Sequence, residues 1–154
     1  MSRIEKTILS NLIHNEQYCR KILPFIKSDY FADRKERMVS EEITKFYDTY
    51  NKPVTLEILA IQLSNRTDIT DKEVGEFDAF VNELTTVDTN EEWLVTETEK
   101  FCKQRAVFNA ILESIKIIEG KDKKLNQEAI PSLLSDALGV SFDRHVGHDY
   151  LEDY

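Results

Sequence analysis

Apolar residues recur along most of this chain at the spacing of an amphipathic α-helix. In residues 3–14 they share one helical face: Ile4, Ile8, Leu9, Leu12 and Ile13. The same 3.6-residue spacing predicts further helices over residues 16–27, 35–50, 56–63, 71–84, 90–119 and 127–138. Only four glycines and three prolines interrupt the chain, so long uninterrupted helices are favoured over a many-stranded sheet, and we predict an all-α fold.

Residues that start and stop helices fall between these segments. Thr55 is expected to cap the helix that follows it. Thr70 with Glu73, and Thr89 with Glu92, have the spacing of capping boxes, in which two backbone N–H groups gain side-chain acceptors. Pro24 predicts either a kink or a stop and restart inside residues 16–27, and Gly120 and Gly139 are natural helix ends.

The segment over 90–119 is longer than a small globule needs, since it would extend roughly 40 Å at the usual rise per residue. Four apolar residues in it are seven positions apart: Leu94, Phe101, Phe108 and Ile115. Thr98, Arg105 and Leu112 occupy the complementary positions of this heptad-like seam. Arg105 either sets the register between paired helices or lies at the edge of the core with its stem packed.

The helix over 127–138 supplies Ile130 and Leu134 to the same seam, and it follows a polar turn at 120–124 that contains Lys121, Lys123 and Lys124. We therefore expect an N-terminal helical globule (1–87), a protruding antiparallel helical hairpin (88–139) and the start of a linker (140–154). An apolar stripe on the outside of such a hairpin would be an association surface.

The charge of the chain limits its partners. A formal net charge of −9 repels phosphate, so strong binding of nucleic acid by this domain alone is not expected. The four glycines are scattered singly, and neither a Walker loop nor a dinucleotide-binding loop occurs in the sequence. Hydrolysis of a nucleotide by this chain is therefore not expected, and we predict no cofactor in it.

Three further kinds of site were weighed. His145, His148 and Asp149 could ligate zinc, but a polar linker explains them better. Cys102 with a histidine could act as a nucleophile, but both Cys19 and Cys102 fall in helical patterns and are expected to be reduced and part-buried. No apolar run reaches the length of a membrane span, and the charged N-terminus has no signal-peptide core.

Several strings of residues carry a resemblance. Asp29-Tyr30-Phe31 and Pro53-Val54-x-Leu56 follow the first helix, in the order found in the N-terminal domain of DnaB-type replicative helicases. The strings beginning at Trp93, Gln104 and Val146 (W-L-V-x-E-T-E-K, Q-R-A-x-F-N-A and V-G-H-D) closely resemble the replicative helicases of T-even-type bacteriophages. The resemblance extends from about Ile4 to Tyr154.

The resemblance implies an N-terminal assembly and primase-docking domain of a hexameric helicase, in which helical hairpins pair in a collar. It also implies a motor domain, absent from this chain, that would use ATP and Mg²⁺ to move 5′ to 3′ on single-stranded DNA in the cytoplasm of an infected bacterium. The DNA would be held only by the full ring. The alternative is a free-standing phage adaptor or loader that binds replication proteins.

Overall fold

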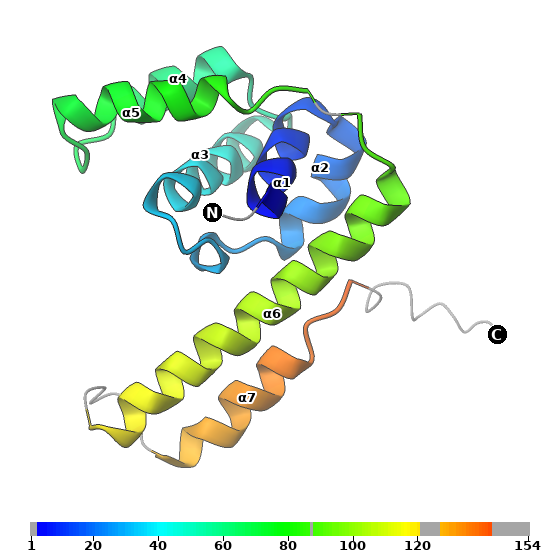
Figure 1. Cartoon of the computed structure of the whole chain (residues 1–154), viewed down its shortest axis with the longest axis vertical. Helices are drawn as coiled ribbons and strands as arrows, with labels where there is room; N and C mark the ends of the chain where they lie inside the picture. Colours follow the sequence, from blue (N-terminus) through cyan, green and yellow to red (C-terminus); the bar gives the residue numbers. More distant parts are fainter. Residues whose placement is uncertain (1–2, 87, 121–126, 143–154) are drawn as a thin grey trace. The chain divides into compact units, whose positions relative to one another are not determined.

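The computed structural model describes residues 3–86, 88–120 and 127–142, and every regular element in these ranges is a helix (Figure 1). The α-helices are α1 (Arg3–His14), α2 (Glu16–Ile22), α3 (Arg34–Tyr50), α4 (Leu56–Ser64), α5 (Asp71–Asn82), α6 (Glu91–Ile118) and α7 (Ile130–Leu138). Short 3-10 helices cover Leu23–Phe25, Ser28–Tyr30 and Gln127–Ala129. The prediction of an all-α fold is confirmed.

Contacts divide the chain into two compact units, Met1–Thr98 and Glu99–Tyr154, and the division falls inside α6. The predicted boundary after residue 87, and the protrusion of a hairpin, stay predictions.

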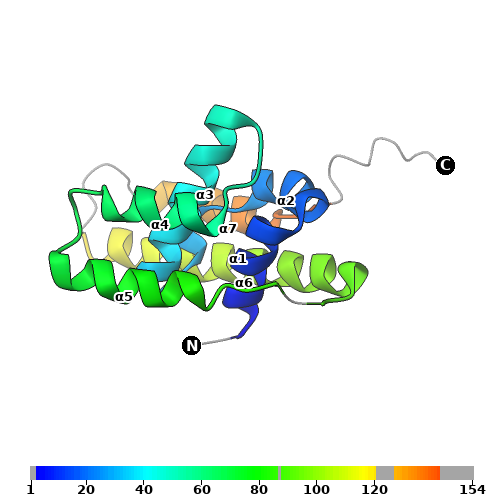
Figure 2. The same ribbon diagram turned by 90° about the horizontal axis from the view of Figure 1, so that it is seen from above.

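The core of the first unit is built by helices that pack in chain order. α1 packs on α2 and α3, α3 packs on α4, and α4 packs on α5, which Figures 1 and 2 show side by side with α4. The largest fully buried side chains come from all of these helices and their connections: Ile8, Leu9, Leu12, Tyr18, Ile22, Phe31, Ile43, Leu59, Leu63, Phe77 and Leu84. The apolar face read from residues 3–14 is thus largely the core face of α1.

Capping side chains fix where three helices begin. The Thr55 hydroxyl accepts from the Ile58 N–H at 3.2 Å, and Thr70 and Glu73 form both bonds of a capping box, as predicted. The predicted box of Thr89 and Glu92 is wrong, because the Asn90 side chain accepts from the Trp93 N–H at 2.9 Å. Asparagine caps at least as well as threonine, so the helix begins one residue later and its third position is Trp93.

The interruption predicted at Pro24 is also present. α2 ends at Ile22, and the Leu23–Phe25 turn follows it, because proline has no backbone N–H to continue the helical bonding. The next turn brings in Tyr30, 4% exposed, and Phe31, which is fully buried. These two rings therefore fill core space between helices.

A charged cluster joins the end of α4 to α3. The Arg66 guanidinium bonds Glu42 at 2.9 Å, Asp68 at 2.8 Å and Glu41 at 3.1 Å. Glu42 is buried and also accepts from the Gln62 amide at 2.7 Å. Because a buried carboxylate needs compensating donors, this cluster of Arg66, Glu41, Glu42, Gln62 and Asp68 holds α4 in place against α3.

Candidate functional site

The predicted seam lies mainly on α6, a helix of 28 residues. Its start is set by the Asn90 cap described above. After its end, Gly120 adopts a φ of 75°, the left-handed conformation in which a side chain is unfavourable. Gly120 thus takes the terminating position expected from the sequence.

One face of α6 in the second unit carries large apolar side chains that are exposed to solvent. Phe108, Ile111, Leu112, Ile115 and Ile118 are 43–61% exposed. They are spaced three and four positions apart, so they form one stripe along the helix. We call these five residues the α6 face. Isolated exposed apolar residues are common, but a continuous stripe of this size is typical of an association surface.

The buried positions of the same stretch are mostly small. Ala110, Ser114 and Ile117 are 5–8% exposed, and the Ser114 hydroxyl donates to the Ala110 carbonyl at 2.8 Å. Ala137 on α7 is 7% exposed, and Figure 1 shows α7 antiparallel beside this part of α6. In this stretch of α6 five large apolar side chains are therefore exposed, while two of the three buried positions are small.

The chain after α7 returns to the start of the second unit. The Glu99 carboxylate accepts from the Phe142 N–H at 2.8 Å and from the Ser141 hydroxyl at 3.2 Å. Phe142 is itself 8% exposed. One carboxylate thus joins positions 43 residues apart and fixes the end of the described chain to α6.

The predicted seam residues divide into three groups. Leu94 and Phe101 are buried, Phe108, Leu112 and Ile115 belong to the exposed α6 face, and Arg105, Ile130 and Leu134 are half-buried. A straight helix drifts roughly 20° for every seven residues, so a strict heptad line moves off a single face over three repeats. A period of 3.6 would have found Ile111 and Ile118, which the heptad reading missed. The role of the seam in self-association stays a prediction.

Arg105 is placed beside this face by an aromatic contact. Its guanidinium carbon lies 4.6 Å from the centre of the Phe108 ring, within the range of a cation–π interaction. The side chain is half-buried, which agrees with the interpretation that its stem packs.

The described residues offer little for covalent or metal chemistry. Cys19 and Cys102 are free and fully buried, and burial raises the pKa of their thiols to about 11 and about 12. A buried, protonated thiol is a poor nucleophile. Within the described ranges no cluster of three His, Cys, Asp or Glu side chains could hold a metal, and no helix there is long and apolar enough to cross a membrane. Lys121, Lys123, Lys124, His145, His148 and Asp149 lie outside the described residues.

Comparison with known proteins gives two matches. A family model described as the DnaB-like helicase N terminal domain matches residues 1–95. A DnaB-like replicative helicase of Enterobacteria phage T4 is 33% identical over 155 residues, which cover 96% of this chain and 32% of that protein. The chain therefore spans about a third of the length of this curated relative.

Proposed function

Because the chain belongs to the family of DnaB-like helicase N-terminal domains, we propose that it is the assembly and partner-docking domain of a replicative DNA helicase. The parent protein would be a ring hexamer that unwinds DNA 5′ to 3′ in the cytoplasm of an infected bacterium and receives a primase on this domain. ATP and Mg²⁺ would be used by a separate motor domain. The similarity to the DnaB-like replicative helicase of phage T4 supports the helicase assignment.

The α6 face carries this proposal. Fully burying a side chain of this kind contributes roughly 1.5–3 kcal/mol, and the chain already covers about half of each one. A twofold pairing would bury the stripes of both copies and contribute about 8–15 kcal/mol, against a cost of association of about 4–15 kcal/mol. Because the free energy gained by burial is similar to the free-energy cost of association, the isolated domain should pair weakly. A stable ring would then need contact surfaces in addition to the α6 face.

The charge of the chain supports a protein-binding role over a DNA-binding one. With a net charge of −9 the domain repels the phosphate backbone, and we propose that single-stranded DNA is held only by the complete ring. The domain would then contribute assembly and docking surface, and no catalytic residue is assigned to it.

Sedimentation at several protein concentrations tests the pairing. The average mass of the wild-type chain should rise with concentration, and Phe108→Asp with Ile115→Asp should abolish the rise, because both side chains are exposed and the fold should tolerate the change. Tyr50→Asp is the matched control, since Tyr50 is 62% exposed on α3 in the first unit and is not one of the α6 face residues. A double variant that still gains mass like the wild type would exclude the α6 face as the contact.

A further inference from the structure

Helix α4 is apolar around most of its circumference. Six of the nine residues of its sequence LEILAIQLS are apolar, and such a helix is normally buried on all sides. Leu59 and Leu63 are indeed buried in the first unit, but Ile61 is 54% exposed. α4 therefore keeps an apolar side that the described chain leaves uncovered.

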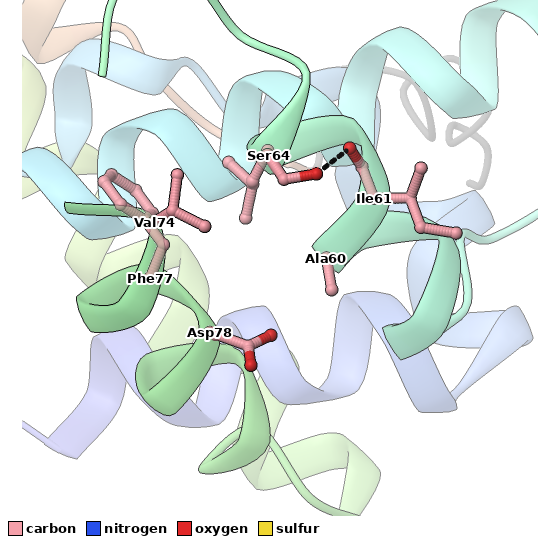
Figure 3. A pocket seen from close by; sticks show the side chains of 7 residues that line it. Ala60, Ile61, Ser64, Val74, Phe77 and Asp78 are labelled. Atoms are coloured by element: carbon pink, nitrogen blue, oxygen red, sulfur yellow. Dashed lines mark hydrogen bonds between the residues drawn. The ribbon is translucent and has the colours of Figure 1, made fainter. Parts of the chain in front are cut away.

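This uncovered side borders a groove between α4 and α5. The groove has a volume of about 270 Å³ and is lined by Ala60, Ile61, Leu63, Ser64, Val74, Phe77 and Asp78. Figure 3 shows Ala60, Ile61 and Ser64 on α4 across from Val74, Phe77 and Asp78 on α5. The Ser64 hydroxyl donates back to the Ile61 carbonyl at 2.8 Å, so its proton is already used within α4.

The size of the groove favours a protein side chain over a small molecule. Pockets for small molecules usually measure roughly 300–1,000 Å³ and enclose most of the ligand. A groove of 270 Å³ with a largely apolar lining can take one large apolar side chain and little more. Such a side chain would complete the packing of Ile61 against α5.

The rim of the groove is acidic. Asp78 lines the groove, and Glu57 on α4 and Asp71 on α5 lie on the same helix faces as the lining residues. All three are exposed, and none of them forms an ion pair with another described residue. Their neighbours Glu73 and Glu83, in contrast, are bonded to Arg34 and Lys6. Three carboxylates without an ion-pair partner beside an apolar groove attract a cationic partner and repel nucleic acid and anionic membranes.

We propose that the α4–α5 groove docks a basic helical segment of a protein partner, with an apolar side chain in the groove and lysines or arginines against the acidic rim. A second copy of this chain fits poorly, because its net charge is −9. The proposal deepens the partner-docking role proposed above and rests on it. It does not depend on the α6 face, which belongs to the second unit.

The test titrates the isotope-labelled chain with a short helical peptide that carries leucines on one side and lysines on the other, and follows backbone amide shifts by NMR. Saturable shifts should cluster on α4 and α5. Ile61→Asp should weaken binding about tenfold, because the apolar wall of the groove becomes charged. Glu57→Lys with Asp78→Lys should also weaken it and reduce its dependence on salt.

Two matched controls decide the outcome. Ile111→Asp makes the same substitution at an exposed isoleucine of the α6 face and should leave the affinity unchanged. A peptide with glutamates in place of its lysines should not bind. Shifts that cluster on α6, equal affinity in Ile61→Asp, or binding of the acidic peptide would overturn the proposal.

The same samples separate this proposal from the proposed function. If the peptide does not bind but the mass still rises with concentration, only the groove proposal is rejected. If the peptide binds but the mass does not rise, only the pairing through the α6 face is rejected. If Ile61→Asp loses its helicity, the variant with Glu57→Lys and Asp78→Lys decides the test, since both residues are exposed.

Discussion

The hydroxyl oxygens of Tyr18 and Thr98 lie 2.7 Å apart, and both residues are fully buried. The Thr98 hydroxyl also donates to the Leu94 carbonyl at 2.7 Å. A hydroxyl has one proton, so the Tyr18 O–H must donate to Thr98. This directed pair joins α2 to the first turns of α6 within the first unit.

Because Tyr18 donates and Thr98 accepts, removing the acceptor and removing the donor should lower the free energy of unfolding by different amounts. Thr98→Val takes the acceptor from a buried donor and should lower the free energy of unfolding by about 1–3 kcal/mol. Tyr18→Phe leaves Thr98 bonded to Leu94 and should lower it by about 0.5–1.5 kcal/mol. Urea unfolding followed by circular dichroism measures both, with Thr98→Ser as the control that keeps the hydroxyl. A larger loss in Tyr18→Phe than in Thr98→Val would reverse the assigned direction.

Glu36 predicts a dependence of stability on pH. It is 1% exposed, and burial together with the charges of Glu5 and Asp33 raises its pKa from 4.5 to about 7. Its Oε2 atom and the Oε1 atom of Glu5 are buried without a hydrogen-bond partner among the described residues. A raised pKa means that the folded state holds the proton more tightly, so this stabilisation is complete below pH 4.5 and is lost as pH rises through about 7.

Glu36→Gln should therefore be more stable than the wild type at pH 8 and should show a flatter stability profile between pH 4.5 and 8. Thermal unfolding across this range measures the difference, with the exposed Glu57→Gln as the control. Parallel profiles for Glu36→Gln and the wild type would show that Glu36 does not titrate in this way.

The cluster around Arg66 predicts a loss of stability and a pKa change. Arg66→Met leaves the buried Glu42 carboxylate with Gln62 but without its countercharge, which should cost about 3 kcal/mol. The bond from Arg66 holds the pKa of Asp68 at about 2, below its usual 3.8, and this pKa should return toward 3.8 in the variant. Denaturant unfolding and an NMR titration of Asp68 measure the two effects.

Asp68→Asn is the matched control, because Asp68 is exposed and Glu42 keeps both of its donors. Its effect on stability should be much smaller. Equal losses in the two variants would mean that the burial of Glu42 does not decide the energetics of the cluster.

Two glycines predict opposite results for the same substitution. Gly75 lies within α5, and an added Cβ would meet no atom within 4 Å, so Gly75→Ala should stabilise the fold by about 0.8–1 kcal/mol. Gly120 has a φ of 75°, where a side chain costs about 1–2 kcal/mol, so Gly120→Ala should destabilise. Melting temperatures compare them, and a lower melting temperature for Gly75→Ala would contradict the open environment of that position.

Features that depend only on residues close together in the chain, such as helix ends and caps, could be predicted from the sequence. The limits of α1, the caps at Thr55 and Thr70 and the interruption at Pro24 follow from spacing and backbone chemistry alone. At Asn90 two adjacent capping residues competed, and spacing could not choose between them.

The candidate sites depend on packing that spacing does not report. The heptad line joined the buried Phe101 to the exposed Phe108, because the side of α6 that faces solvent is set by tertiary contacts. Ile61 resembles any core isoleucine in sequence, and its exposure follows from how α4 and α5 pack. The hydrogen bond between Glu99 and Phe142 joins residues 43 positions apart, so no local sequence pattern predicts it.

The bond between Glu99 and Phe142 brings the two ends of the second unit together. Because Glu99 holds the backbone at Phe142, the chain leaves the second unit close to where it entered, and the end of α6 and the start of α7 are connected along the chain only to each other. Turns could be added to or removed from those far ends without moving whatever is attached before Glu99 or after Phe142. The reach of the α6 face can thus change between relatives while the attachment points of its neighbours stay fixed.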